Sequence, residues 1–345
     1  MANRIAVVTG ASGYVASWIV KLLLENDWQV RGSVRDVSAT KKVAHLTALG
    51  DDHPGRLELF EADLLSSGSF DAACEGADVV VHTASPFVTG EVEDARERLI
   101  EPAVRGTDNV LGAAARADSV RRVVLTSSVV AVNGDADEVK RTPDGVLTEE
   151  HWNATAREDY QPYGYSKTLA EQRAWELAEQ APWSLAVINP GFVLGPSLTS
   201  RGDSTSIAVM QQMLSGAFAD GVPQLTFGVV DVRDVARAHV AAAEMEEAGG
   251  RHITVGTHAR LLEMARIIEE HYPGRFRLPH KEVPKLLFYL MGPKFGFGRR
   301  YVRHNVGVPV RYDNSRSRER LGMSYRPIGD TLRDHVAQLE RDGLI

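Results

Sequence analysis

The sequence predicts an α/β protein with a Rossmann-type doubly wound parallel sheet and a smaller, interleaved C-terminal domain. Three observations support this fold class. Short apolar runs alternate with helical stretches through the first half of the 345 residues, and a glycine-rich turn directly follows the first apolar run. The alternation fades after Asn189, where Gly, Pro and Ser become frequent. Strand, helix and strand repeated in this order indicate right-handed crossovers and a parallel sheet.

Each expected strand is a short run of apolar residues. Ile5–Thr9 reads IAVVT, which is typical of a strand buried on both faces. The stretch 13–25 follows with apolar residues near the 3.6-residue period of a helix. Further strands are expected at Gln29–Val34, 56–64, 78–84, 121–127, 183–190 and 252–256, and helices at 92–117, 162–181 and 230–244.

Composition excludes several classes of function. The net charge of −7 gives no general attraction to nucleic acid or to an anionic membrane. Cys74 is the only cysteine, so no disulfide framework exists, and the 11 histidines are scattered without a metal-binding spacing. The N-terminal residues form no apolar run long enough for a signal peptide or span. We expect a cytoplasmic protein without a metal, whose oligomeric state the sequence leaves open.

The turn TGASGYVAS opens the first helix and predicts dinucleotide binding. Gly10, Gly13 and Ala16 have the G-x-x-G-x-x-[G/A] spacing, with a strand before them and a helix after them. Gly10 permits a tight turn, and Gly13 lets backbone N–H groups approach a pyrophosphate at the positive end of the helix. The alternative is a glycine-rich turn that binds nothing.

The end of the second strand predicts NADP(H) rather than NAD. An acid at this place would accept hydrogen bonds from the ribose 2′-hydroxyl of NAD, whereas an arginine favours the 2′-phosphate of NADP. The sequence places Arg35 first, Asp36 behind it, and Lys41 and Lys42 on the next helical stretch. The guanidinium of Arg35 suits a bidentate phosphate contact, while Asp36 argues for NAD.

Further cofactor contacts are expected at the carboxyl ends of the third and fourth strands, where ligands bind in such sheets. Asp63 and Leu64 follow the third strand, beside the expected adenine, and the alternative role for Asp63 is to cap a loop. Thr83, Ala84 and Ser85 follow the fourth strand and are small enough for a cofactor to pass close by.

The stretch QPYGYSK provides the expected chemistry. Pro162 suits the first turn of a helix, and Tyr163 and Lys167 then lie four residues apart on one face. Tyr165 points about 200° away from Tyr163 and cannot share that face. A nearby ammonium is expected to lower the pKa of the Tyr163 phenol toward neutrality, which suits a proton donor to a reduced carbonyl oxygen. Lys167 could also hold the nicotinamide ribose.

A hydroxyl group at the end of the fifth strand completes the predicted site. Thr126, Ser127 and Ser128 end that strand and face the same crevice. A serine hydroxyl there could donate a hydrogen bond to a substrate carbonyl oxygen and polarise it. Tyr-x-x-x-Lys or Thr-Ser-Ser alone is common by chance, but the two together after a nucleotide-binding turn indicate an enzyme.

These motifs together resemble the extended short-chain dehydrogenase/reductases, in particular the dihydroflavonol 4-reductase-like aldehyde and ketone reductases. The resemblance rests on VTGASGYVASW, HTASPF, LTSSV, YGYSKTLAEQRAW, NPGFVLGPSL and VDVRDVARAH, and it resumes near the C-terminus at YDNSRSRERLGMSYRP. It implies a catalytic triad of Ser128, Tyr163 and Lys167, with Ser127 as the alternative serine. The cysteine-containing motif around the catalytic tyrosine of cinnamoyl-CoA reductases is replaced by QPYGYSK, which argues against CoA thioester reduction.

The resemblance also implies the cofactor contacts and the domains. The cofactor pyrophosphate would contact Gly10, Ser12, Gly13, Tyr14 and Val15. The 2′-phosphate would contact Arg35 and Lys42. The nicotinamide and its ribose would lie near Ser127, Tyr163, Lys167, Pro190, Gly191 and Val193. Substrate contacts are expected from Phe87, Ser128 and Tyr163. We expect 1–191, with a returning segment at about 225–257, to form the NADP-binding Rossmann domain, and 192–224 with 258–345 to form the substrate-binding domain.

We therefore expect an oxidoreductase that reversibly reduces an aldehyde or ketone to an alcohol with NADPH, with Tyr163 as proton donor. A nucleotide-sugar epimerase or related NAD(P)-dependent enzyme of the same fold is the main alternative, although its Thr-Asp-Glu motif is absent. A non-enzymatic NADP sensor is a third possibility, which the Tyr–Lys pair disfavours. The partner would be a small carbonyl or alcohol substrate.

Overall fold

A computed structural model describes residues 4–86, 94–199 and 205–345. Its largest element is a seven-stranded sheet in the order β10-β6-β5-β4-β1-β2-β3, in which every neighbouring pair is parallel. The strands are β1 (Ile5–Thr9), β2 (Gln29–Val34), β3 (Leu57–Glu61), β4 (Val79–His82), β5 (Arg122–Thr126), β6 (Ser184–Pro190) and β10 (Gly250–Thr254). The predicted fold class is confirmed: this is a Rossmann-type doubly wound sheet.

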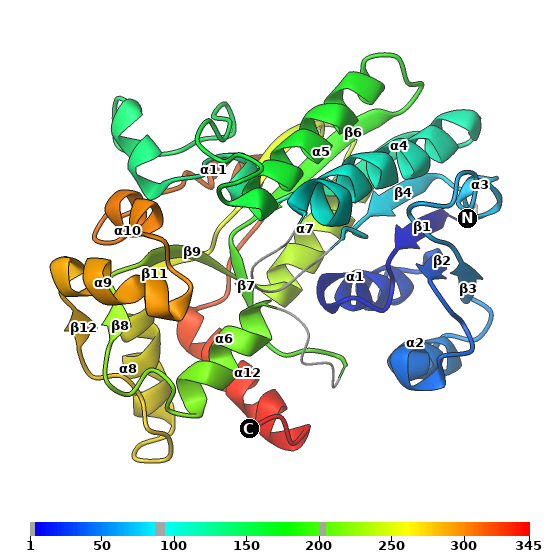
Figure 1. The fold of residues 1–345 in the computed structure, drawn as a ribbon. Helices are drawn as coiled ribbons and strands as arrows, with labels where there is room; N and C mark the ends of the chain where they lie inside the picture. Colours follow the sequence, from blue (N-terminus) through cyan, green and yellow to red (C-terminus); the bar gives the residue numbers. More distant parts are fainter. Residues whose placement is uncertain (1–3, 87–93, 200–204) are drawn as a thin grey trace.

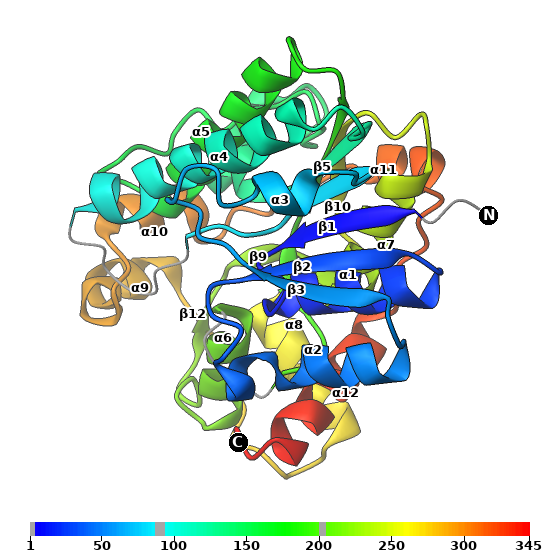
Figure 2. The same cartoon turned by 90° about the vertical axis from the view of Figure 1, so that its right-hand side faces the viewer.

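Helices cover both faces of this sheet, as Figure 2 shows from its edge. One face packs against α1 (Tyr14–Glu25), α2 (Thr40–Asp52) and α7 (Val232–Glu244). The other packs against α3 (Asp71–Cys74), α4 (Glu101–Arg116) and α5 (Pro162–Ala178). The residues of the inner strands β1, β4, β5 and β6 are buried on both faces, which explains why these strands appear in the sequence as apolar runs.

The remaining elements form a second, smaller region. A three-stranded sheet has the order β11-β9-β7, and a two-stranded sheet pairs β12 with β8. These strands are β7 (Phe192–Leu194), β8 (Val222–Pro223), β9 (Thr226–Asp231), β11 (Thr257–Arg260) and β12 (Glu282–Val283). The helices are α6 (Thr205–Leu214), α8 (Leu261–His271), α9 (Lys285–Met291), α10 (Arg299–Asn305) and α12 (Ile328–Arg341), whereas α11 (Ser315–Arg320) packs against β10 of the large sheet.

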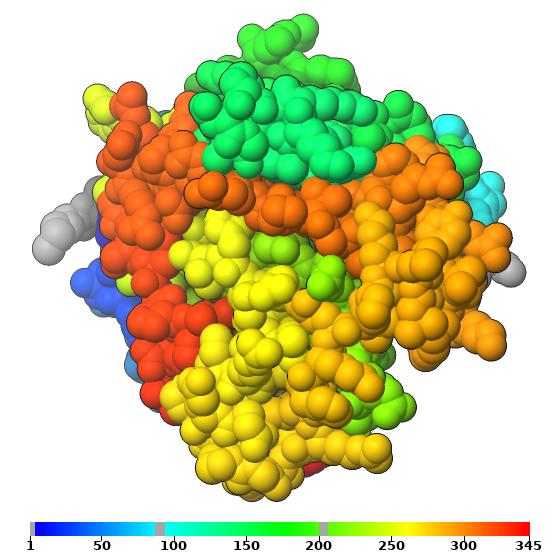
Figure 3. Space-filling model, turned by 90° about the vertical axis from the view of Figure 1, so that its left-hand side faces the viewer, coloured from blue at the N-terminus to red at the C-terminus, as the bar shows by residue number. Residues whose placement is uncertain are grey.

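The two regions are joined at several points. On the face drawn in Figure 3, the orange segment of about 290–315 runs beneath the green segment of about 135–160. Backbone hydrogen bonds support this contact, from the Leu147 N–H to the Arg311 carbonyl oxygen and from the Asp313 N–H to the Leu147 carbonyl oxygen, each at 2.8 Å. Two side chains of α1 also reach the loop after β7, since the Tyr14 hydroxyl donates to the Gly195 carbonyl oxygen at 2.6 Å and the Trp18 indole to that of Pro196 at 2.8 Å.

Most predicted elements agree with the structure, and three need correction. The strand expected at 252–256 is β10, which begins two residues earlier, at Gly250, and ends at Thr254. The helix expected at 92–117 is α4 over Glu101–Arg116, preceded by a π-helical turn at Arg96–Ile100; residues 92 and 93 lie outside the described residues. The strand expected over 56–64 ends at Glu61. The stretch 192–224 does leave the large sheet, but it contains β7, α6 and β8. The division into two domains stays a prediction.

Gly191 marks the point at which the chain leaves the large sheet for the small one. Its N–H donates to the Thr254 carbonyl oxygen at 3.1 Å. A Cβ atom at Gly191 would lie 2.2 Å from the Gly228 carbonyl oxygen, which belongs to the backbone of β9 and cannot move aside alone. Only glycine therefore permits this close approach of the two sheets.

We expect Gly191→Ala to lower the free energy of unfolding by about 2–3 kcal/mol or more, because the added methyl group overlaps backbone. Urea denaturation followed by circular dichroism would measure the loss. Gly50→Ala is the matched control: it lies in α2, its Cβ would meet only Leu57 at 3.7 Å, and it should be neutral or slightly stabilising. Equal stability of the two variants would contradict the steric argument.

Candidate active site

Two glycines shape the turn after β1. Gly10 has φ +63°, a left-handed conformation that side chains rarely adopt. A Cβ atom there would lie 3.1 Å from the Cβ of Ala84, and one at Gly13 would lie 3.1 Å from the Gly10 carbonyl oxygen. That oxygen accepts a hydrogen bond from the Gly13 N–H at 2.8 Å. The turn therefore brings bare backbone to the carboxyl ends of β1 and β4.

The start of α1 is open to an anion. Its first backbone hydrogen bond runs from the Ser17 N–H to the Gly13 carbonyl oxygen at 2.9 Å, so the N–H groups of Tyr14, Val15 and Ala16 have no acceptor within the helix. No side chain of the described residues caps this end, and its first turn has no acid. The helix N-terminus therefore retains the partial positive charge that binds phosphate groups, and these residues, with Ser12, fit a pyrophosphate.

Asp36, the acid at the end of β2 that argued for NAD, has a structural role in its own turn. The Asp36 carboxylate accepts hydrogen bonds from the backbone N–H of Ser38 at 2.8 Å and from its hydroxyl at 2.6 Å, and these bonds lower the pKa of Asp36. Asp36 thus stabilises its own turn. Arg35 and Lys42 are both exposed, so their charged groups are accessible to a 2′-phosphate.

The other predicted cofactor residues line the same edge of the sheet, and several have structural partners. One carboxylate oxygen of Asp63 accepts from the Leu65 N–H at 2.8 Å, which is the loop-capping role considered above. The Leu64 side chain packs against Gly106 of α4. At the end of β4, the N–H groups of Thr83 and Ala84 donate to the Thr9 hydroxyl at 3.1 and 3.0 Å, and Ser85 is half-buried.

The first turn of α5 presents Tyr163 and separates it from Tyr165. Gln161 precedes the helix with φ +55°, and Pro162 occupies its first position. Tyr163 is 36 % exposed, whereas Tyr165 lines a different, shallow pocket with Arg157. The prediction that only one of the two tyrosines lies on the lysine's face of the helix agrees with this arrangement.

Lys167 is 8 % exposed, and its ammonium donates to the Thr126 carbonyl oxygen at 3.4 Å. Burial lowers the pKa of Lys167 to about 8, while Glu171 acts in the opposite direction. The expected lowering of the Tyr163 pKa is wrong for this structure, because loss of hydration raises it to about 12 even though part of the side chain remains exposed. Tyr163 therefore carries its proton at neutral pH.

The two serines after β5 have different surroundings. Ser127 is buried, and its hydroxyl donates to the Glu171 carboxylate at 2.5 Å. Ser128 is half-buried and begins the short 3-10 helix Val129–Ala131, which packs against α5. The Ser128 hydroxyl lies 3.5 Å from the Pro190 carbonyl oxygen. Of the two, Ser128 therefore has the hydroxyl group that a substrate could reach.

The remaining predicted contacts follow β6. Pro190 ends β6, Gly191 joins it to β7, and Val193 in β7 is half-buried. Of these residues, Pro190 lies beside Ser128, as its contact with the Ser128 hydroxyl shows. Phe87, the expected substrate residue, lies outside the described residues.

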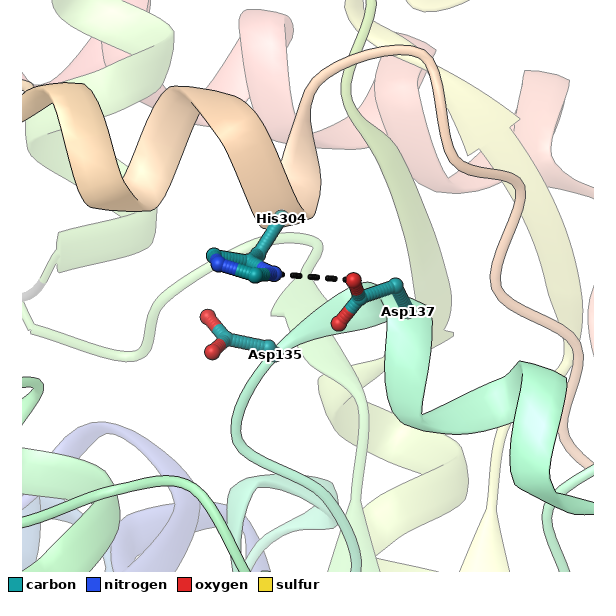
Figure 4. A group of neighbouring side chains, drawn as sticks. All are labelled: Asp135, Asp137 and His304. Carbon is teal, nitrogen blue, oxygen red and sulfur yellow. Dashed lines mark hydrogen bonds and ion pairs between the residues drawn. The ribbon is translucent and has the colours of Figure 1, made fainter.

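The fold gathers three possible metal ligands that the sequence scatters. Ligand atoms of Asp135, Asp137 and His304 lie within 4.8 Å of one another, and Figure 4 shows the three side chains pointing toward one another. The His304 Nδ1 atom lies 2.8 Å from the Asp137 carboxylate. The Asp135 carboxylate accepts hydrogen bonds from Tyr160, Gln161 and Asn305. These hydrogen bonds join α10 to the residues just before α5, so the three side chains have a structural role. The absence of a metal stays a prediction.

Comparison with known proteins identifies the family to which this protein belongs. The profile of the "NAD dependent epimerase/dehydratase family" matches residues 6–256. The chain belongs to this family, the extended short-chain dehydrogenase/reductases, and within it to the dihydroflavonol 4-reductase-like branch. The predicted resemblance is confirmed.

Named relatives narrow the class to reductases. The chain is 38% identical over 343 residues to cinnamoyl-CoA reductase CAD2 of Medicago truncatula, covering 98% of this chain and 96% of the relative. It is 37% identical over 288 residues to an anthocyanidin reductase of Vitis vinifera, covering 80% and 83%. The crystal structure of yeast methylglyoxal/isovaleraldehyde reductase Gre2 complexed with NADPH superimposes with a TM-score of 0.80 at 28% identity, covering 99% of this chain and 100% of that one.

The protein is therefore an NADP(H)-dependent oxidoreductase. Among the described residues, no helix combines the length and the apolar character needed to cross a membrane. Two buried acids near the predicted site, Glu171 and Asp135, were given no role in the sequence analysis, although Glu171 lies within the motif YGYSKTLAEQRAW. Glu171 follows Lys167 by four residues, a spacing that could have identified it, whereas the partners of Asp135 are too scattered in sequence to do so.

We expect Arg35→Ser to weaken NADPH use, measured as kcat/KM, by roughly ten- to hundredfold, because one charged hydrogen-bonded pair contributes about 1.5–3 kcal/mol. The value for NADH should change little. Arg105→Ser is the matched control, since Arg105 is an exposed arginine on α4. Equal losses with NADPH and NADH would reject the 2′-phosphate contact.

Proposed function

We propose that this enzyme reduces an aldehyde or ketone to an alcohol with NADPH, with Tyr163 as the proton donor, Ser128 as the group that polarises the carbonyl, and Lys167 as their charged partner. The observation that carries the proposal is the place of Lys167. It is a buried ammonium one helical turn after Tyr163, bonded to the last carbonyl oxygen of β5, two residues before Ser128. Burying a cation costs free energy, and the negative charge that develops during the reaction would compensate the charge of Lys167.

The cofactor fits the open N-terminus of α1 and the bare backbone of the glycine turn. When bound, NADPH supplies the hydride that adds to the carbonyl carbon. The O–H bond of Tyr163 then breaks and its proton passes to the carbonyl oxygen, which completes the alcohol; solvent returns a proton to the phenolate. Ser128 donates a hydrogen bond to the same oxygen, and the charge of Lys167 stabilises the phenolate while it exists.

The pKa of Tyr163 is compatible with this role. A value near 12 keeps the phenol protonated at neutral pH, as a proton donor must be. It also makes the phenolate costly after the transfer, so the reaction depends on the nearby ammonium. The pKa of Lys167, near 8, leaves most of this group charged at neutral pH.

The names of the relatives suggest a range of substrates. They include cinnamoyl-CoA, tetraketide α-pyrone, anthocyanidin and methylglyoxal or isovaleraldehyde reductases. A panel of aldehydes, α-dicarbonyls, aryl ketones and cinnamoyl-CoA, each with NADPH, would identify the class used here. The sequence QPYGYSK argues for the carbonyl compounds over the thioester. Tightly held nicotinamide cofactor without net turnover of any of them would favour an epimerase.

We expect Tyr163→Phe to lower kcat by about 10²–10⁴, because the proton donor is lost. Cofactor binding, followed by fluorescence of NADPH, should survive. Tyr165→Phe removes the same atom from a tyrosine two residues away in the same helix and should retain activity. Retained turnover in Tyr163→Phe would mean that another group is the acid.

A further inference from the structure

Glu171 is a buried acid at the centre of a hydrogen-bond network behind the proposed site. It is 1 % exposed and lies in α5, one turn after Lys167. Both carboxylate oxygens are bonded. One oxygen accepts from the Arg251 Nε at 2.5 Å and from the Trp175 indole at 3.4 Å. The other accepts from the Ser127 hydroxyl at 2.5 Å and from the Asn189 amide at 2.9 Å.

These donors connect α5 to three strands of the large sheet. Ser127 directly follows β5, Asn189 lies in β6, and Arg251 lies in β10. The Asn189 amide also donates to the Ser128 carbonyl oxygen at 3.2 Å. A single carboxylate thus fixes the helix that bears Tyr163 and Lys167 against the strand end that bears Ser128.

Arg251 is held from the other side, so the network is rigid. Its Nη1 atom donates to the carbonyl oxygens of Glu149 at 2.8 Å and His151 at 2.5 Å. Its guanidinium stacks on the Trp152 ring, 4.0 Å from the ring centroid. Every contact of this arginine is therefore compatible with a fixed orientation toward Glu171.

The charges around Lys167 indicate a second role for Glu171. The groups that interact with the Lys167 ammonium include the Thr126 carbonyl on β5, His82 on β4 and Glu171 on α5 itself. His82 is buried beside Lys167, and burial lowers its pKa to about 3, so it is uncharged. Arg251 adds a second cation to the network. Glu171 is thus the acid that compensates a buried ammonium, whose desolvation otherwise favours the neutral amine.

We infer that Glu171 is a positioning residue for the reduction: its carboxylate keeps Lys167 charged and holds the Ser128 turn against the first turn of α5. The inference rests on the proposed function, in which Lys167 assists proton transfer from Tyr163. It makes no use of direct contact between Glu171 and the substrate, because the carboxylate is enclosed by its four partners.

The test is the pH dependence of kcat for Glu171→Gln at saturating NADPH and carbonyl substrate. Removal of a negative charge lowers the pKa of Lys167 and also that of Tyr163. The pH at which activity is lost on the alkaline side should therefore fall, whichever of the two groups titrates. A fall of about one pH unit gives roughly a tenfold loss of kcat above the new limit and a smaller loss at pH 6.

The control is Glu176→Gln, the same substitution at an exposed acid of the same helix, which should leave the profile of the wild-type enzyme unchanged. Glu171→Asp keeps the negative charge but shortens the side chain by one methylene group. The alkaline limit of its pH profile should therefore shift in the same direction as that of Glu171→Gln, but by less. If Glu171→Gln fails to fold, the comparison of Glu171→Asp with the wild type decides the question. Profiles that superimpose on that of the wild type would overturn the inference.

The two proposals can fail separately. If Tyr163→Phe keeps its turnover, the proposed function is wrong, whatever the profile of Glu171→Gln. If Tyr163→Phe is inactive and the Glu171 variants lose activity equally at every pH, the proposed function stands, and Glu171 is a structural residue without influence on the charge of Lys167.

Discussion

The candidate site depends on a charge that is largely removed from water. Lys167 is 8 % exposed, and a buried ammonium costs several kcal/mol unless its surroundings compensate it. A backbone carbonyl oxygen of β5 accepts a hydrogen bond from the ammonium, and Glu171 lies one turn away on the same helix. The low polarity that makes this cation expensive also strengthens its attraction for an anion at a neighbouring phenol. The cost of burial and the capacity for chemistry thus have the same origin.

Backbone geometry brings the members of the site together. The end of β5, the end of β6 and the first turn of α5 meet where the chain passes from the large sheet to the small one. Gly191 permits the two sheets to approach there, and Gly10 permits the approach of β1 and β4 at the neighbouring edge. The site therefore lies where ligands bind in open α/β sheets, outside the carboxyl ends of the strands and next to a change of direction in the chain.

The sequence predicts the large sheet well because its inner strands are buried on both faces, which leaves apolar runs such as IAVVT without interruption. The small sheets have no comparable pattern. Strands β8 and β12 have two residues each, too few for any periodicity. In the site, the spacing of Tyr163 and Lys167 is local and could be predicted. The direction of the Tyr163 pKa could not, because it depends on surroundings contributed by distant segments. The hydrogen bond from the Ser38 N–H to the Asp36 carboxylate likewise could not be predicted, because no sequence motif indicates it.

The path of the chain between the regions has a consequence for how this enzyme can be divided. After β6 the chain builds β7, α6, β8 and β9, returns through α7 and β10, and then leaves again for β11. A fragment ending at residue 190 would lack the edge strand beside β6 and the helix that covers Val8, Val81 and Val124, exposing an apolar face to water. No single cut yields a complete nucleotide-binding half, so the two regions should melt as one cooperative unit, and cofactor should protect the whole chain from proteolysis.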